Sequence, residues 1–378
     1  MDLNNRRAQS GAMTTSADYG YADYQDLAAD LPFRRLPDLA DRRLGAGVLA
    51  ANDELFAERE NLLLPTPARF QPHTFGPKGQ LMDGWETRRR RGAGTDRPHP
   101  DAEDHDWVLV RLGLPGVIHG VVVDTAHFRG NHPQRISVEA VELPGTPGPE
   151  ELLAPTTRWQ QIVAPGAVRG HAANAFEVTE RRRFTHLRLK QYPDGGIARL
   201  RVHGESRPDQ AWLAALGTFD LAALEHGGSV EDASDRFFSP PVNLILPGRS
   251  REMGEGWENR RRRDGGHDWV RLRLAGRAVV RAVEIDTANY VGNAAGWAAV
   301  LGFDASGGGD PADPADGGWF ELVPRTLLQP DTLHRFLVPA AAGARAASHA
   351  RLDVFPDGGV ARLRLHGSLV GPAPEPLA

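Results

Sequence analysis

The chain carries the same series of short sequence strings twice and in the same order. Polar and aromatic residues dominate these strings, which pair residues 61–65 with 243–247, 84–91 with 256–263, 105–108 with 267–270, 124–126 with 286–288, and 193–196 with 356–359. Self-similarity over this length indicates two copies of one structural unit. A chain of 378 residues is also long enough for two cores of ordinary size. The sequence therefore predicts two tandem domains of the same fold.

The repeated strings and the composition between them set the expected domain limits. We expect a loose N-terminal tail at residues 1–25, a first repeat at 26–205, a second repeat at 206–368 and a proline-rich tail at 369–378. Leucines and a tryptophan recur at helical spacing over residues 209–225. The second repeat is therefore expected to begin with a short connecting helix or two.

Strand patterns are present in both repeats. Residues 270–274, 198–203 and 361–365 alternate apolar side chains with arginine or histidine, which is the period of two of a half-buried strand. Residues 121–123 and 279–285 are richer in valine and are expected to form more deeply buried strands. The 42 glycines and 29 prolines supply the turns that many short strands need. We predict an all-β chain in which each repeat is a β-sandwich.

The composition excludes several classes of partner. Lysine plus arginine total 44 against 49 acidic residues, a net charge of -5, so nucleic acid and anionic membrane surfaces are not expected partners. No apolar run is long enough to cross a membrane, and the first 25 residues lack the apolar run of a signal peptide. The absence of cysteine excludes disulfides and thiolate chemistry and fits a reducing compartment. We expect a cytoplasmic protein that binds small molecules.

The string Gly-Trp-Glu-x-Arg is the most specific candidate for function. Trp85, Glu86 and Arg88 would place a carboxylate and a guanidinium beside a rigid indole, an arrangement that suits a polar anion. The counterparts in the second repeat are Trp257, Glu258 and Arg260. The alternative reading is structural, with the tryptophan anchoring a loop and the arginines solvating a sheet edge.

A second polar string directly follows a buried strand. Its candidate functional residues are Asp124, His127, Arg129 and Asn131, because loops at the ends of a rigid scaffold commonly carry binding residues. The second repeat keeps Asp286 at the position of Asp124 and Asn293 at the position of Asn131. It loses the histidines, with Asn289 in place of His127 and Ala294 in place of His132. Any imidazole chemistry is therefore confined to the first repeat. Alternatively, the aspartate and the following threonine only stabilise a turn.

Standard catalytic signatures are absent from the sequence. It has no nucleophile elbow, no His-Glu-x-x-His string and no phosphate-binding loop ending in Gly-Lys. His99, Asp101, Glu103 and His105 form one ligand-rich loop, which does not predict a metal centre without a second cluster to complete it. No cofactor is expected, and a divalent metal stays an open alternative.

Together, the strings at residues 82–89, 105–107, 123–131 and 192–196 resemble the allantoicase family. The resemblance extends over most of the chain and includes the duplication. It implies two jelly-roll domains similar to galactose-binding modules, and hydrolysis of allantoate to (S)-ureidoglycolate and urea in purine degradation. It also favours a homo-oligomer. The second repeat departs from the pattern at Asn259, Asn289 and Ala294, which argues against an independent active site there.

The implied substrate assigns expected roles to the candidate residues. Allantoate has one carbon that bears a hydrogen, a carboxylate and two ureido groups. Arg88 or Arg129 is expected to bind the carboxylate, and Trp85 and Asn131 complete the expected substrate-binding set. The candidates for the general acid and the general base are His127, Glu86 and Asp124.

Two other functions are compatible with the sequence. A non-enzymatic protein that binds a carbohydrate or another small ligand would need exposed aromatic platforms, for which Trp85 and Trp257 are the candidates. A structural or regulatory protein could use the arginine clusters for partners, but it would leave the repeated Trp-Glu and Asp-Thr strings unexplained.

Overall fold

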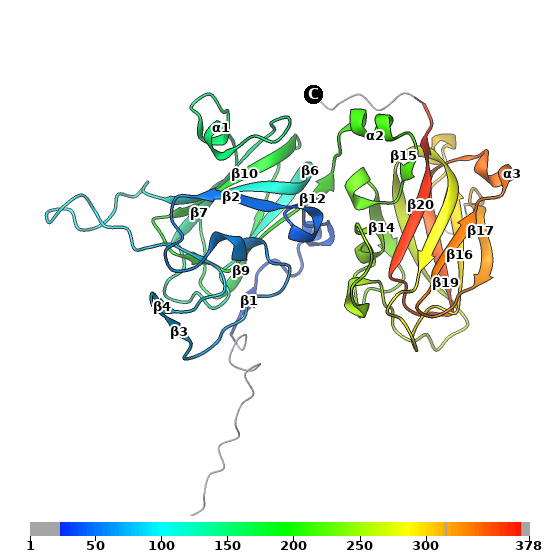
Figure 1. Ribbon diagram of the computed structural model, residues 1–378, viewed down its shortest axis with the longest axis horizontal. Coiled ribbons are helices and arrows are strands. Elements are labelled where there is room, and N and C mark those ends of the chain that lie inside the picture. Colours follow the sequence, from blue (N-terminus) through cyan, green and yellow to red (C-terminus); the bar gives the residue numbers. More distant parts are fainter. Residues whose placement is uncertain (1–22, 314–315, 372–378) are drawn as a thin grey trace, which may run out of the picture.

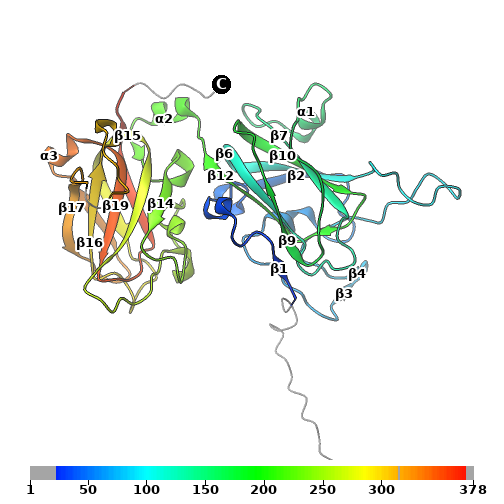
Figure 2. The same ribbon diagram turned by 180° about the vertical axis from the view of Figure 1, so that it is seen from behind.

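The chain forms two β-rich lobes, one for each sequence repeat. The computed structural model describes residues 23–313 and 316–371. The lobes lie side by side, the first coloured blue to green and the second green to red in Figure 1. Figure 2 shows the same separation from behind. Of the two predicted tails, residues 1–22 and 372–378 lie outside the described residues.

The first lobe is built on one eight-stranded sheet that folds over into two layers. Its strands are β1 (Gln25–Asp26), β2 (Gly47–Ala51), β6 (Asp106–Asp124), β7 (Arg135–Val141), β8 (Gln160–Ala167), β9 (Ala172–Glu177), β10 (Arg183–Tyr192) and β12 (Arg199–Ser206). Four short strands form two further ribbons at the end of the lobe, β3 (Phe75–Gly76) with β4 (Gly79–Gln80) and β5 (Trp85–Glu86) with β11 (Gly196–Ile197).

The long strand β6 joins the two layers. It has 19 residues; its first half pairs mainly with β2 and β10, and its second half pairs with β9 and β12. Apolar side chains at Val108, Val110, Val121 and Val123 are fully buried. Because alternate residues of a strand share a face, this pattern keeps one side of each half against the interior of the sandwich.

The second lobe repeats this architecture. Its strands are β13 (Phe219–Asp220), β14 (Ser229–Ala233), β15 (Asp268–Asp286), β16 (Trp297–Phe303), β17 (Phe320–Leu327), β18 (Leu333–Leu337), β19 (Ala346–Phe355) and β20 (Arg362–Leu369). β15 also has 19 residues and takes the place of β6. Residues 121–123 and 279–285, the expected buried strands, are the C-terminal parts of β6 and β15. The prediction of an all-β chain of two tandem sandwiches is confirmed.

Helices are few and short. The α-helices are α1 (Pro149–Leu153), α2 (Gln210–Leu216) and α3 (Ala340–Gly343), and the 3-10 helices are η1 (Pro32–Arg35), η2 (Arg42–Leu44), η3 (Arg59–Leu63), η4 (Leu224–His226), η5 (Pro241–Ile245), η6 (Met253–Glu255) and η7 (Ala305–Gly307). In the described part of the chain, no helix has the length and apolar character that a membrane crossing requires.

The segment between the repeats is helical over less of its length than the leucine spacing suggests. α2 begins after Asp209, whose side chain accepts hydrogen bonds from the backbone N–H groups of Ala211 and Trp212, as an N-cap residue does. It ends at Leu216, and the residues after its C-cap Gly217 form β13 and η4 instead of a second α-helix. Leu221 and Leu224 are buried, so these leucines face the core from the turn after β13 and from η4.

A buried histidine in β10 makes the stability of the first lobe depend on pH. Only 2 % of the surface of His186 is exposed, and burial, followed by the charge of Arg111, lowers the pKa of this imidazole to about 4. In the unfolded chain the pKa of a histidine is about 6.5. Between these values the unfolded state holds more protons than the folded state, so stability falls as the pH falls.

We therefore expect the native chain to lose more stability than His186→Gln between about pH 6.5 and pH 4. The extra loss in the free energy of unfolding is at most about 3 kcal/mol. Guanidinium unfolding of both proteins at several pH values measures the difference. An identical pH dependence in the two proteins would contradict the prediction.

Candidate active site

The two candidate strings meet at one end of the first sandwich. β5 pairs with β11 in antiparallel register, with Trp85 opposite Ile197. The next residue, Ala198, donates its backbone N–H to the carbonyl oxygen of Asp124 over 2.7 Å. A Cβ on Gly84 would lie 2.6 Å from the ring of Phe128, so glycine is needed for this close approach. Residues 84–91 and 124–132 therefore share one loop region.

Trp85 anchors this region from inside. Its side chain is fully buried, and its indole N–H donates to the backbone carbonyl oxygen of Asp53 over 2.8 Å. Trp257 is equally buried, and its indole N–H donates to the carbonyl oxygen of Asp235 over 3.0 Å. Neither indole presents a face to solvent. Both repeats thus use the tryptophan to hold the following arginine string on the sandwich.

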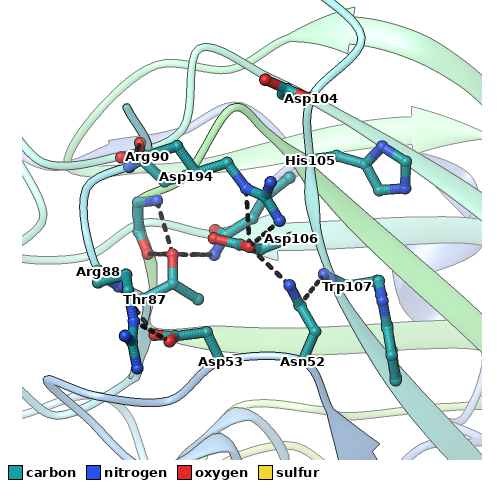
Figure 3. A network of polar contacts seen from close by, with 12 residues as sticks. Asn52, Asp53, Thr87, Arg88, Arg90, Asp104, His105, Asp106, Trp107 and Asp194 are labelled. Atoms are coloured by element: carbon teal, nitrogen blue, oxygen red, sulfur yellow. Dashed lines mark hydrogen bonds and ion pairs between the residues drawn. The ribbon is translucent and has the colours of Figure 1, made fainter. Parts of the chain in front are cut away.

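The arginines of residues 88–91 make two kinds of contact, with carboxylates of the framework and with a cavity. Arg88 forms an ion pair with Asp53, and Arg90 donates from Nε and Nη2 to Asp106 over 3.0 and 2.7 Å. Figure 3 shows both pairs, together with Asn52, which donates to the same carboxylate. The second repeat keeps this framework, with Arg260 on Asp235 and Arg262 on Asp268. Arg89 and Arg91 border a cavity, and so does Arg90 beside its contact with Asp106.

This cavity, hereafter the first-repeat cavity, has a volume of about 1160 Å³. Its charged lining consists of five cationic side chains and three carboxylates, Lys78, Arg89, Arg90, Arg91, Arg135, Glu86, Asp101 and Asp194. Residues 99–102 line it from the loop between β5 and β6, which is longer than the matching loop of the second repeat. The excess of positive charge favours an anionic ligand.

Glu86 and Asn131 lie together on the wall of the first-repeat cavity. The side-chain amide of Asn131 donates to Oε1 of Glu86 over 2.8 Å. Burial raises the pKa of Glu86, while the hydrogen bond from Asn131 and the charge of Arg89 oppose that shift. A carboxyl whose pKa is raised keeps its proton to higher pH and is therefore better suited to act as a proton donor.

The second repeat contains the same carboxylate and amide in a more crowded setting. Asn293 donates to Oε1 of Glu258 over 2.7 Å. The sulfur of Met253 lies 3.1 Å from the amide nitrogen of Asn293. Within the described residues, the amide nitrogen of Asn131 has no such contact with a sulfur atom. The hydrogen-bonded pair of carboxylate and amide is therefore part of the repeated framework.

His132 contributes an imidazole to the first-repeat cavity. Its Nδ1 lies 2.7 Å from the carbonyl oxygen of Arg129. A carbonyl oxygen only accepts hydrogen bonds, so Nδ1 is the donor in this contact, which leaves Nε2 as the ring nitrogen that can exchange a proton with a ligand. Nearby, the guanidinium of Arg135 lies 5.0 Å from the ring centre of Tyr192, a geometry that holds this cation over the aromatic face.

Sequence reasoning did not select several of these cavity residues for a role. Arg89 and Arg91 were part of the string but were not separated from Arg88 and Arg90, and Arg135 stood in no repeated string. The one available signal was the loop insertion between the arginine string and His105. Loops that differ in length between two otherwise equal repeats are where a site of one repeat is built.

His127 lies outside the lining of the first-repeat cavity. Its Nε2 is 3.2 Å from the carbonyl oxygen of Ala68, its ring stacks on Phe70, and its backbone N–H donates to Nδ1 of His171 over 2.9 Å. Burial lowers the pKa of His127. The backbone φ of 67° at this position is one that side chains with a branched Cβ avoid, and the second repeat has Asn289 with φ 70°.

Asp124 and Arg129 also lie outside this lining, and the N-terminal segment contacts both. Asp124 accepts hydrogen bonds from the hydroxyl of Tyr24 over 3.1 Å and from the backbone N–H of Ala126 over 2.8 Å. Burial raises the pKa of Asp124. Arg129 forms an ion pair with Asp23. In the second repeat, Asp286 accepts from the backbone N–H of Ala288 over 2.9 Å.

The possible metal ligands of the loop at residues 99–105 do not come together. His105 directs Nδ1 to the carbonyl oxygen of Glu103 over 2.8 Å. Across residues 23–313 and 316–371, no three histidine or carboxylate side chains are grouped as metal ligands. The cavity lining offers cationic side chains that can bind an anion, together with a carboxyl and an imidazole, Glu86 and His132, that can exchange protons.

The fold and the cavity define a tandem β-sandwich protein with a cavity of cationic lining in its first repeat. A model of the allantoicase repeat matches residues 37–207 and 219–370. A probable allantoicase of Streptomyces avermitilis is 62% identical over 349 residues, 92% of this chain and 89% of that protein, and one of Streptomyces coelicolor is 61% identical over the same shares.

A solved structure supports the same relationship. The crystal structure of allantoicase from Saccharomyces cerevisiae has 31% sequence identity and a TM-score of 0.72, and the match covers 91% of this chain and 99% of that chain. The chain belongs to the allantoicase family.

Proposed function

We propose that this chain is an allantoicase that hydrolyses allantoate to (S)-ureidoglycolate and urea in its first-repeat cavity. The observation that supports the location is the pairing of a half-buried carboxyl, Glu86, whose pKa burial raises, with an excess of guanidinium groups in the same cavity lining. The carboxylate of the substrate needs the cations, and the departing urea needs a proton. Membership of the allantoicase family supports the reaction itself.

Arg89 binds the carboxylate of the substrate in this proposal. Its charge acts on Glu86, and its side chain makes no hydrogen bond or ion pair within the described ranges. Arg88 and Arg129, the candidates of the sequence, are already paired with Asp53 and Asp23. A planar guanidinium can hold a carboxylate by two parallel hydrogen bonds, which would place the central carbon beside Glu86.

The reaction proceeds by proton transfer without a covalent enzyme intermediate. Glu86 donates its proton to the nitrogen of the leaving ureido group as the carbon–nitrogen bond breaks and the electron pair leaves with urea. The lone pair of the retained ureido nitrogen forms a double bond to the central carbon. Water attacks that carbon, and Nε2 of His132 accepts the proton of the water. A proton returned from His132 to Glu86 through solvent restores the starting state.

The remaining candidate residues position this machinery in the proposal. Trp85 and Arg88 hold the arginine string, while Asp124, His127 and Arg129 hold the loop that carries Asn131 and His132. The counterparts in the second repeat serve that repeat in the same way, at Trp257, Glu258, Arg260, Asp286 and Asn293. One active site per chain follows from this assignment.

The carbohydrate-binding alternative lacks its expected platforms, because both Trp85 and Trp257 are fully buried. Incubation of the purified chain with allantoate, followed by measurement of urea and ureidoglycolate, separates the two functions. Equimolar release of both products is expected. A protein that binds galactose and releases no urea would overturn the proposal.

Replacement of Arg89 by alanine tests the carboxylate contact. Hydrogen bonds to charged groups stabilise by about 1.5–3 kcal/mol, so kcat/KM for allantoate is expected to fall by about 10- to 100-fold, mainly through KM. Arg261→Ala removes the equivalent arginine of the second repeat and is expected to leave the kinetics unchanged. Equal losses in the two variants would remove Arg89 from the substrate contacts.

We also propose that the chain acts in the cytoplasm as a homo-oligomer. The support for both is the resemblance to the family. Light scattering of the purified protein measures the mass against the 41.1 kDa of one chain, and a monomer at micromolar concentration would contradict the oligomer.

A further inference from the structure

Each repeat buries one arginine at the start of its last strand. Arg199 begins β12 and lies opposite Asp124, while Arg362 begins β20 and lies opposite Asp286. Their exposed fractions are 1% and 5%. The surrounding sequence, Ala-Arg-Leu-Arg, is identical in the two repeats. Burial of a guanidinium costs free energy unless hydrogen bonds and an anion compensate its charge. Because the two arginines occupy equivalent positions, their partners can be compared directly.

Arg199 has a complete set of partners. Its Nε donates to the carbonyl oxygen of Thr66 over 2.9 Å, and its Nη1 donates to the carbonyl oxygens of Asp83 and Ala198. Its Nη2 donates to the side-chain carboxylate of Asp83 over 2.9 Å. The charge of the buried guanidinium is thus neutralised within the first repeat.

Arg362 has the carbonyl partners but not the carboxylate. Its Nε donates to the carbonyl oxygen of Gly248 over 3.1 Å, and its Nη1 donates to those of Glu255 and Ala361 over 2.6 and 2.8 Å. Glu255 stands where the first repeat has Asp83, but its carboxylate accepts from Nε of Arg251 over 2.9 Å. In the part of the chain that the structure describes, Nη2 of Arg362 has no hydrogen-bond acceptor.

Two small cavities lie against Arg362, with volumes of about 160 and 200 Å³. Arg249 borders both cavities, and Arg43 of the first repeat borders the larger one. Every other arginine of their walls has a carboxylate within ion-pair distance, in the pairs Arg43 with Asp41, Arg249 with Asp286, Arg251 with Glu255 and Arg364 with Asp220. Among the described residues, Arg362 is the arginine of these walls that has no carboxylate within ion-pair distance.

We propose that Arg362 and Arg249 bind a small oxyanion, a carboxylate or a phosphate, in these cavities. The anion takes the place that Asp83 occupies in the first repeat and accepts from Nη2 of Arg362. Arg249 is 74% exposed in its side chain and lies 3.6 Å from Asp286, so it is free to turn toward the anion. Burial and the charge of Arg364 lower the pKa of Arg362 to about 10, as expected of an undercompensated cation.

This oxyanion site is distinct from the first-repeat cavity, because the two share no lining residue. Arg43 comes from η2 of the first repeat, whereas Arg249 and Arg362 belong to the second repeat. A bound anion would therefore add an attraction between the repeats, and it would stabilise the folded chain in proportion to its concentration relative to the dissociation constant.

Thermal unfolding in sodium phosphate, sodium acetate and sodium chloride of equal ionic strength tests the proposal. Phosphate or acetate is expected to raise Tm by at least about 2 °C over chloride at saturating concentration. Arg249→Gln is expected to abolish the rise, and it should fold because this side chain is mostly exposed. Arg362→Met should abolish it too, although that variant is itself destabilised.

Two control variants exclude other causes. Arg261→Gln removes an exposed arginine of the same repeat, and Arg89→Ala removes the proposed anion contact of the first-repeat cavity; both should keep the rise. A rise in phosphate alone assigns a phosphate ligand, and a rise in acetate alone assigns a carboxylate. No rise in either salt, or a rise that Arg249→Gln retains, would overturn the proposal.

Discussion

Replacing Glu86 by glutamine is expected to lower the turnover of allantoate by about 100- to 10,000-fold, the range that a general acid contributes. The glutamine side chain is isosteric and can still accept the hydrogen bond of Asn131. The geometry of the cavity wall is therefore kept while the transferable proton is lost. The melting temperature of Glu86→Gln is expected to stay close to that of the native chain. Steady-state assay of urea release measures the effect.

The second repeat supplies the matched control for Glu86. Glu258 accepts a hydrogen bond from Asn293 just as Glu86 accepts one from Asn131. Glu258→Gln makes the same chemical change in the same local framework, and we expect it to leave turnover unchanged. A large loss in Glu258→Gln, or full activity in Glu86→Gln, would contradict catalysis at the first-repeat cavity.

The pH profile gives Glu86 a second signature. A general acid works in its protonated form, so kcat should fall as the pH rises through the pKa of Glu86. Burial holds that pKa above the usual range of a glutamate. Glu86→Gln should lose this limb of the profile, whereas a variant with a purely structural defect would keep it at reduced amplitude.

Replacing Trp85 by alanine is expected to destabilise the first lobe by about 3–5 kcal/mol, the usual cost of removing a large buried aromatic side chain. The indole is fully buried and donates to the carbonyl oxygen of Asp53. Its removal leaves both a cavity and an acceptor without a donor. Guanidinium unfolding monitored by far-UV circular dichroism measures the change in the free energy of unfolding.

Two further tryptophans serve as comparisons for this prediction. Trp257→Ala should cost a similar amount, because that indole has the same burial and the same hydrogen bond to a carbonyl oxygen. Trp212 in α2 is 60% exposed, and Trp212→Ala should change the stability by less than about 0.5 kcal/mol. A loss below about 1 kcal/mol in Trp85→Ala would refute its role as the anchor of the loop region.

Many of the polar residues that recur in both repeats turn out to stabilise the fold. Thr125 and Thr287 each donate from Oγ1 to a backbone carbonyl oxygen over 2.6 Å, and Asp106 and Asp268 are buried partners of Arg90 and Arg262. Loops at the end of a sandwich leave backbone groups that must be satisfied. Repetition of polar residues therefore marked the framework around the site as strongly as the site itself.

The candidate site was predictable only in part for this reason. Glu86 and Asn131 were chosen from their strings, and the structure brings them together on the cavity wall. The sequence could not distinguish Arg88 from Arg89, because they differ in whether a carboxylate from a distant segment pairs with them. Arg88 has such a partner, Asp53. Asp53 is 35 residues from Arg88 in the chain, and no local pattern shows that it lies beneath one arginine and not the next.

The amino-acid sequence alone determined that the chain has two copies of one β-rich unit, since duplication and the period of two are properties of residues near each other in the chain. The tertiary structure decided which of the repeated side chains are available to a ligand. That choice depends on burial and on the pairing of charges from distant segments, as at Glu86, Arg89 and Arg362. Two repeats with almost the same strings thus differ in which guanidinium groups have a carboxylate partner.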